Sequence, residues 1–180
     1  LLLENYPDTL LDQTCKMVVR RQIAYGKEHG VPWGISESAF NVTDRQAHER
    51  FWGDALGGIR TPWRANAAFK FPNALVLLTD RKPSGGTIGS TVNHIGFWVP
   101  NTRAMLDRIR AAGFPVITAR ELPGADVRDG MVCSDSQNTC IAYVLGPDDV
   151  KVEIVENRAQ TIPIQNHHIH FHTPHVDQLR

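Results

Sequence analysis

The sequence predicts an α+β fold built from repeated strand–helix modules, preceded by an unrelated helical segment. Strand and helix signals alternate over residues 93–157. The stretch NHIGFWVP at 93–100 returns as HHIHFHTP at 167–174, with His, Ile, Phe and Pro identical at a constant spacing. Repetition of this kind indicates a supersecondary unit used more than once.

The N-terminal segment is predicted to be one helix followed by a loop. Residues 12–29 carry a rough apolar stripe, with Asp12 or Thr14 able to cap the start and Gly30 placed to end the helix. GVPWGISESAF, residues 30–40, has two glycines and a proline within its first five positions, which predicts an irregular loop.

A second helix is predicted from an N-cap at Asp44, with Ala47, Phe51 and Ala55 on one face and Gly57 at its end. Three strand-like stretches follow: GIRTPWR, AAFKF and ALVLLTD. The glycine-rich RKPSGGTIGS lacks the pattern of a phosphate loop, so it is interpreted as a linker.

The next unit has the clearest signals. NHIGFWVP is a predicted strand, and residues 101–113 are a predicted helix that Asn101 or Thr102 caps and Gly113 ends. PVITARE, residues 115–121, is a predicted strand. NTCIAYVLGPDDVKVEIVEN predicts two strands joined by a turn at Pro147–Asp149.

Composition limits the class of protein. Nineteen basic residues balance nineteen acidic ones in 180 residues, without a basic cluster, so nucleic acid is not expected as a partner. No apolar run approaches the roughly 18 to 20 residues of a membrane span. Cys15, Cys133 and Cys140 form no CxxC pair, which favours reduced, buried thiols and a cytoplasmic protein. The absence of an initial Met suggests a processed or partial sequence.

The repeat has a third, weaker copy. ESAFNVTD, residues 37–44, fits the same frame and places Glu37 where NHIGFWVP has His94. The chain therefore has three candidate module openings, near residues 37, 93 and 167, and the middle module is the complete one.

The stretches VNHIGFWVPNTRAMLDRIRAAGFPVIT and YVLGPDDVKVEIVE resemble the glyoxalase / bleomycin-resistance / dioxygenase superfamily, the vicinal oxygen chelate proteins. The resemblance covers about residues 45–180 and implies paired βαβββ modules around one divalent metal ion, such as Fe²⁺, Zn²⁺, Mn²⁺ or Ni²⁺. It implies His94 and Glu153 as ligands, with Glu37 at the position of a further ligand that is usually His. His168 would open a second domain.

Residues 1–43, which include VPWGISES, resemble a fragment of the glycoamylase-like domain of cyclic β-glucan synthases. We therefore predict a junction of two unrelated sequences: a helical segment and loop over 1–43 and a vicinal oxygen chelate domain over 44–157. The domain would divide into module one at 44–90 and module two at 91–157. Residues 158–180 would be a linker and the first strand of a truncated second domain.

Each predicted ligand has a plainer interpretation. His94 is also consistent with a hydrogen-bonded histidine at a sheet edge, and Glu153 with an outward-facing residue on a half-exposed strand, although the resemblance favours the ligand role for both. Glu37 has the weakest case and is more simply interpreted as an exposed loop residue. The tract NHHIHFHTPH places His168, His170 and His172 on one strand face, where adventitious metal binding is the ordinary expectation. Alternatively, this strand folds back and supplies His168 to a centre with His94 and Glu153.

The resemblance implies a metal-dependent lyase, isomerase or dioxygenase that acts on a small oxygenated molecule. One alternative is a non-catalytic protein that binds a small molecule, as bleomycin-resistance proteins do. Another is an inactive chimeric fragment. The expected partner is a small-molecule substrate, and a homodimer is compatible with the sequence. Neither a membrane nor nucleic acid is expected as a partner.

Overall fold

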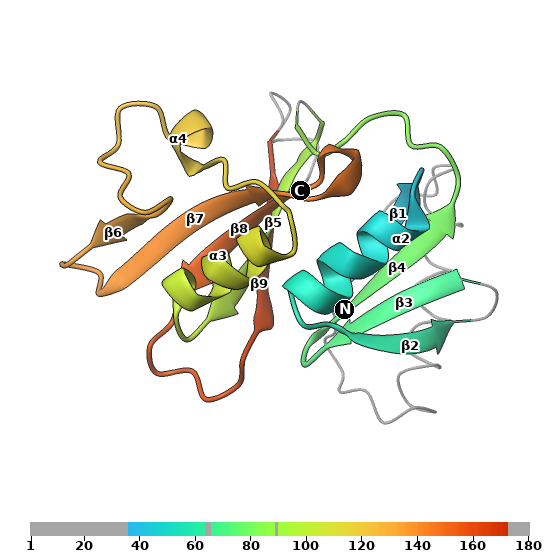
Figure 1. Ribbon diagram of the computed structural model, residues 1–180, viewed down its shortest axis with the longest axis horizontal. Coiled ribbons are helices and arrows are strands. Elements are labelled where there is room, and N and C mark those ends of the chain that lie inside the picture. Colours follow the sequence, from blue (N-terminus) through green and yellow to red (C-terminus); the bar gives the residue numbers. More distant parts are fainter. Residues whose placement is uncertain (1–35, 64–65, 89, 173–180) are drawn as a thin grey trace, which may run out of the picture. The chain divides into compact units, whose positions relative to one another are not determined.

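Two mixed β-sheets, each accompanied by a helix, make up the described part of the chain (Figure 1). The structure is a computed structural model that describes residues 36–63, 66–88 and 90–172. Cys15 and the helix predicted over residues 12–29 both lie outside the described residues.

The elements in chain order are β1 (Ser36–Val42), α2 (Arg45–Glu49), the π-helix η1 (Arg50–Ala55), β2 (Ile59–Trp63), β3 (Asn66–Phe71), β4 (Ala74–Asp80), β5 (Val92–Val99), α3 (Thr102–Ala111), α4 (Thr118–Glu121), β6 (Val132–Ser134), β7 (Thr139–Leu145), the 3₁₀ turn η2 (Pro147–Asp149), β8 (Lys151–Glu156) and β9 (Gln165–Phe171).

The first sheet has the strand order β1-β4-β3-β2, with β1 parallel to β4 and the other neighbours antiparallel. Its helix begins where predicted, because the Asp44 side chain accepts a hydrogen bond from the backbone N–H of Ala47. The helix continues from α2 into η1, buries Phe51 and Trp52, and is followed by Gly57 at a φ of +83°. The βαβββ order of this unit is therefore confirmed.

The loop predicted over residues 30–40 is wrong from Ser36 onward, because this part of the chain is strand β1. The glycines and proline that favoured a loop all precede Ser36, and the following backbone pairs with the apolar strand β4. Phe40 then stacks on Trp52 with ring centroids 5.4 Å apart. The strand precedes residue 44, the predicted start of module one, and pairs with a strand of that module.

The second sheet has the order β6-β7-β8-β5-β9. β5 is parallel to β8, which repeats the relation of β1 to β4, and β9 is antiparallel to β5 on its other side. Helix α3 has Asn101 as its N-cap and buries Met105, Leu106 and Ile109, as predicted. The chain leaves this helix through Gly113, whose φ is +87°. The turn between β7 and β8 also lies where the sequence placed it.

The strand predicted over residues 115–121 is wrong. Val116 forms an isolated bridge with Val144, and the backbone then turns into the short helix α4. The Thr118 hydroxyl donates to the carbonyl of Gly130 and accepts from the backbone N–H of Tyr143. The Gly130 carbonyl and the Tyr143 N–H are thus bonded to a side chain and are not free to pair with a strand over residues 115–121. The pairing with β7 therefore ends near Val116.

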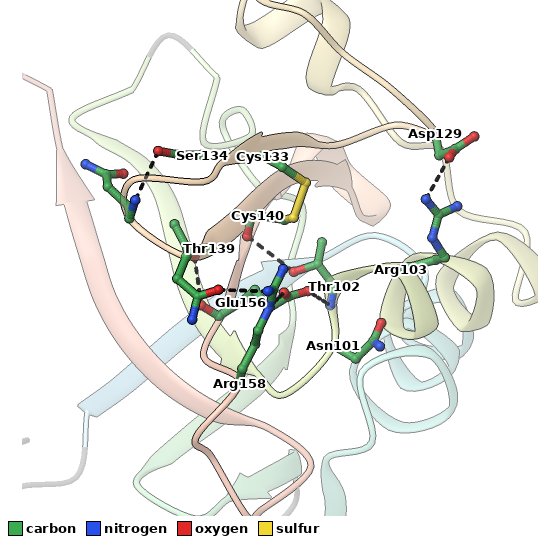
Figure 2. Close-up of a disulfide and its surroundings, with 12 residues drawn as sticks. Asn101, Thr102, Arg103, Asp129, Cys133, Ser134, Thr139, Cys140, Glu156 and Arg158 are labelled. Atoms are coloured by element: carbon green, nitrogen blue, oxygen red, sulfur yellow. Dashed lines mark hydrogen bonds and ion pairs between the residues drawn. A yellow bond between two sulfur atoms is a disulfide. The ribbon is translucent and has the colours of Figure 1, made fainter.

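The prediction of reduced thiols is also wrong for two of the three cysteines, because Cys133 and Cys140 form a disulfide (Figure 2). β6 and β7 are antiparallel, and their register places Cys133 directly opposite Cys140. A sequence separation of seven gives no CxxC signal, and β6 was not predicted. The disulfide therefore follows from hairpin pairing, which brings the two residues into range.

Apolar residues from both sheets belong to one hydrophobic cluster within Ser36–Arg180. Phe97 of β5 lies 4.9 Å from Phe71 and 6.5 Å from Trp52, measured between ring centroids. A polar contact accompanies this packing, since Nε2 of the fully buried His48 lies 3.0 Å from Oδ2 of Asp148. Within the described ranges, every helix is too short or too polar to cross a membrane.

Candidate metal centre

The second sheet separates an apolar face from a polar face, because strand residues alternate between its two sides. On β5, Ile95 and Phe97 enter the hydrophobic cluster, whereas His94 lies on the opposite face. On the neighbouring strand β8, Ile154 enters the cluster and Glu153 lies on the face of His94. This alternation directs a histidine and a carboxylate toward each other.

The third side chain comes from β9. Nε2 of His168 lies 3.0 Å from Nε2 of His94 and 3.2 Å from Oε2 of Glu153. The remaining separation, from His94 Nε2 to Glu153 Oε2, is 3.4 Å. His94 and Glu153 are 3% and 8% exposed, so water solvates these two polar groups poorly. The sequence-predicted residues His94, Glu153 and His168 are therefore brought together in one place.

Glu153 is held as a carboxylate. Burial by itself would raise its pKa, but the adjacent His94 and Tyr143 side chains lower the pKa below the ordinary value. The Tyr143 hydroxyl donates to Oε1 over 2.7 Å. Burial, followed by this bond to Glu153, raises the pKa of the Tyr143 phenol. At neutral pH the tyrosine thus remains a donor and Glu153 remains negatively charged.

His168 is favoured as a neutral imidazole, because burial lowers its pKa, and this effect together with that of the neighbouring histidines outweighs the opposing effect of Glu153. Its Nδ1 lies 3.0 Å from Nδ1 of His167, and Nδ1 of His94 lies 2.8 Å from Oδ1 of Asn93. Neutral imidazole is the form that binds metal ions.

A clamp from the first sheet fixes the start of β9. The Asn73 amide donates to the carbonyl of Asn166 over 2.7 Å and accepts from its backbone N–H over 2.8 Å. The buried Asn166 side chain in turn donates to the carbonyl of Gly96. Gly96 pairs with His168, and a β-carbon at position 96 would overlap the His168 imidazole. Gly96 thus leaves the space that the His168 side chain occupies.

The donor set and its spacing fit a divalent cation. Two ligand atoms bonded at about 2.0–2.2 Å to one ion lie about 3.0–3.5 Å apart when they subtend roughly 90° to 110° at the metal. The three separations above fall within that interval. Two imidazoles and a carboxylate are suitable ligands for Fe²⁺, Zn²⁺, Mn²⁺ and Ni²⁺.

His170 provides an alternative third ligand. Ligand atoms of His94, His168 and His170 lie within 4.8 Å of one another, which is a looser arrangement than the one with Glu153. His170 is exposed and is the direct cross-strand neighbour of His94. Two ligand sets are thus available, and both contain His94 and His168.

Glu37 belongs to β1 of the first sheet, where its backbone pairs with Leu75. Its side chain lies outside the described residues, so its role as a ligand stays a prediction. Sequence reasoning missed Tyr143, although a signal was present. A turn centred on Asp148 places Tyr143, five residues before it, opposite Glu153, five residues after it.

Comparison with solved structures identifies the fold, while no family model matches the chain. A glyoxalase-related enzyme from Fulvimarina pelagi is 15% identical with a TM-score of 0.52, and the likeness covers 79% of this chain and 100% of that one. A putative glyoxalase family protein from Bacillus anthracis is 19% identical with a TM-score of 0.49, over 70% of this chain and 96% of that one. The chain has the glyoxalase/bleomycin-resistance, or vicinal oxygen chelate, fold.

A second likeness is short. The chain is 44% identical over 46 residues to the cyclic beta-(1,2)-glucan synthase NdvB of Rhizobium meliloti (strain 1021). The match covers 26% of this chain and spans 2% of the length of the synthase. The predicted resemblance to cyclic β-glucan synthases is confirmed as a partial match of this extent.

Proposed function

We propose that this chain is a metal-dependent enzyme of the vicinal oxygen chelate type that acts on a small oxygenated molecule. The proposed ligands are His94, His168 and Glu153. The observation that carries the proposal is the convergence of their Nε2, Nε2 and Oε2 atoms to separations of 3.0–3.4 Å. The fold supports it as well, since a glyoxalase-related enzyme shares that fold.

The convergence suits a cation. When each imidazole carries its proton on Nδ1, both Nε2 atoms and the carboxylate oxygen present lone pairs to one another, and that arrangement is unfavourable unless a cation lies between them. Two of the three groups are buried, so water compensates them incompletely. A divalent ion would be stabilised by all three atoms and would remove their mutual repulsion.

A divalent metal bound here would supply a Lewis acid that polarises substrate oxygen atoms. The protein contributes the orientation of the ligands. The Tyr143 hydroxyl donates a hydrogen bond to Oε1 of Glu153 and so fixes this oxygen. The other oxygen, Oε2, is left directed at the two histidines. Asn73 holds the backbone of Asn166 at the start of β9, and the Asn166 side chain joins that strand to Gly96 of β5. Whether the reaction is that of a lyase, an isomerase or a dioxygenase follows from the native metal and the substrate.

Metal analysis tests the proposal. The purified chain is stripped with chelator, reconstituted separately with Fe²⁺, Zn²⁺, Mn²⁺ or Ni²⁺, and freed of weakly held ions before the bound metal is counted. We expect about one equivalent in the wild type, and loss of tight binding in His94→Ala, His168→Ala and Glu153→Gln. His172→Ala is the matched control, because it removes an exposed histidine just after β9.

The variants also identify the third ligand. If Glu153→Gln retains tight metal binding and His170→Ala loses it, the third ligand is His170 and not Glu153. A folded wild-type chain that binds none of the four ions tightly would contradict the proposal and favour the non-catalytic binding protein. An aggregated or unfolded chain would contradict it in favour of the inactive fragment.

A further inference from the structure

Strands β5 and β9 form an antiparallel pair that contains two bulges. The register passes from Val92 opposite Phe171 directly to His94 opposite His170, which leaves Asn93 as an extra residue on β5. It then passes from Gly96 opposite His168 to Phe97 opposite Asn166, which leaves His167 as an extra residue on β9. Each extra residue immediately precedes one of the two histidines of the metal centre.

The two bulges are related by the internal repeat. Ile95 and Ile169 are equivalent residues of the repeat and pair directly with each other. Equivalent positions, such as His94 and His168, are 74 residues apart. Asn93 and His167 are equivalent by the same spacing, so an approximate local two-fold axis relates the two strands and their bulges. The same local arrangement therefore accompanies each histidine.

The bulges change which side chains can meet. In a regular strand, adjacent residues point to opposite faces and their side chains do not touch. A bulge re-aims one residue, and here each extra residue contacts the histidine that follows it. Oδ1 of Asn93 lies 2.8 Å from Nδ1 of His94, and Nδ1 of His167 lies 3.0 Å from Nδ1 of His168.

Both contacts involve Nδ1, the imidazole nitrogen of His94 and of His168 that is not directed at the other ligand atoms. An amide oxygen only accepts hydrogen bonds, so Asn93 favours the His94 tautomer with the proton on Nδ1. The His167 ring is itself held in place, because it stacks on Trp98 with centroids 4.1 Å apart and an interplanar angle of 18°. It can therefore present a fixed acceptor to the Nδ1 proton of His168.

We propose that Asn93 and His167 are positioning residues of the metal centre. They accept the Nδ1 protons of His94 and His168, respectively, and thereby hold both Nε2 atoms unprotonated and directed at the cation. This inference rests on the proposed metal-dependent function. Partners of this kind commonly change metal affinity by about 10–100-fold when they are removed.

The test combines two measurements at one fixed alkaline pH. Long-range ¹H–¹⁵N NMR of the histidine-labelled chain reports the imidazole tautomers in the metal-free and Zn²⁺-loaded states. Competition with a chromogenic chelator gives the Zn²⁺ affinity. Asn93→Leu and His167→Phe remove the acceptors, and the phenyl ring preserves stacking on Trp98. Asn93→Asp and His167→Gln restore an acceptor. The controls Asn41→Leu and His172→Phe repeat the chemical changes at exposed positions outside the proposed ligand set.

We expect Asn93→Leu to shift the metal-free His94 signals toward the Nε2-protonated tautomer, and His167→Phe to do so for His168. Each should weaken Zn²⁺ binding by about 10–100-fold, while the acceptor-restoring variants recover most of the affinity and the controls keep it. Unchanged tautomers and affinity in Asn93→Leu and His167→Phe would overturn the inference. Failure of the wild type to bind Zn²⁺ would contradict the proposed function, whereas an Nε2-protonated His94 in the metal-free wild type would contradict this inference alone.

Discussion

The imidazole of His168 lies against the α-carbon of Gly96, in space that any other residue at position 96 would fill. The two residues are direct neighbours across β5 and β9. Glycine is thus required at this position for His168 to approach His94 and Glu153.

Substitution of Gly96 by Ala should displace His168 and weaken metal binding at the proposed centre. The added β-carbon overlaps the imidazole, so the ring must move or β9 must shift. We expect at least a 10-fold loss of Zn²⁺ affinity, by analogy with the loss of an orienting partner, measured by chelator competition. Gly85→Ala is the control, since nothing lies within 4 Å of a β-carbon there. Equal affinity in both variants would show that His168 is not a ligand.

Removal of β9 should abolish tight metal binding. A chain that ends at residue 164 retains His94 and Glu153 and loses His168 and His170. Bound metal is counted after dialysis against a weak chelator, together with the full-length His168→Ala variant, because the shortened chain exposes the edge of β5. One tight equivalent retained by both proteins would exclude a ligand from β9.

Loss of the Asn73 clamp should loosen β9. Asn73→Ala removes two hydrogen bonds to the backbone of Asn166, at a cost of about 1–3 kcal/mol. Hydrogen–deuterium exchange of residues 165–171 should accelerate in the metal-free protein, while exchange in α3 stays the same. Asn41→Ala, an exposed change on β1, serves as the comparison. The clamp would be irrelevant if exchange in 165–171 were identical in the two variants.

Stability should fall as the pH decreases below the ordinary histidine value of 6.5. Burial lowers the pKa of His48 and outweighs the opposing effect of Asp148. The unfolded chain therefore takes up a proton near that pH while the folded chain resists it, so acid favours unfolding. Urea denaturation of the metal-free chain between neutral pH and about pH 5 measures the trend. The slope should be smaller in His48→Gln, and an unchanged slope would assign the effect to other groups.

Reduction of the disulfide should destabilise the chain without removing the metal. The Cys133–Cys140 bond closes a short hairpin, for which chain entropy gives about 2 kcal/mol. Calorimetry with and without reductant should show a lower Tm for the reduced wild type. Cys133→Ser should match the reduced wild type and should not respond to reductant. Identical Tm values in all samples would contradict a stabilising role.

Local signals were sufficient where a short segment determines its own structure. The caps at Asp44 and Asn101 and the turn before β8 were predicted because hydrogen bonds within a few residues fix them. The strand predicted at 115–121 failed for the complementary reason. Thr118 bonds to Gly130 and to Tyr143, which are distant in sequence, and these bonds direct the chain into α4.

The sequence by itself determined the helices that begin after Asp44 and Asn101, the strands that carry His94 and Glu153, and the repeat that singles out His168. These features depend on residue periodicity, which is a local property. Tertiary structure decided where β9 pairs, that Cys133 meets Cys140, and that bulges bring Asn93 and His167 to the two histidines. Such choices depend on register and on contacts between distant segments. A shift of the strand register by one residue moves a side chain to the opposite face of the sheet. These contacts are therefore fixed only when the strands pair.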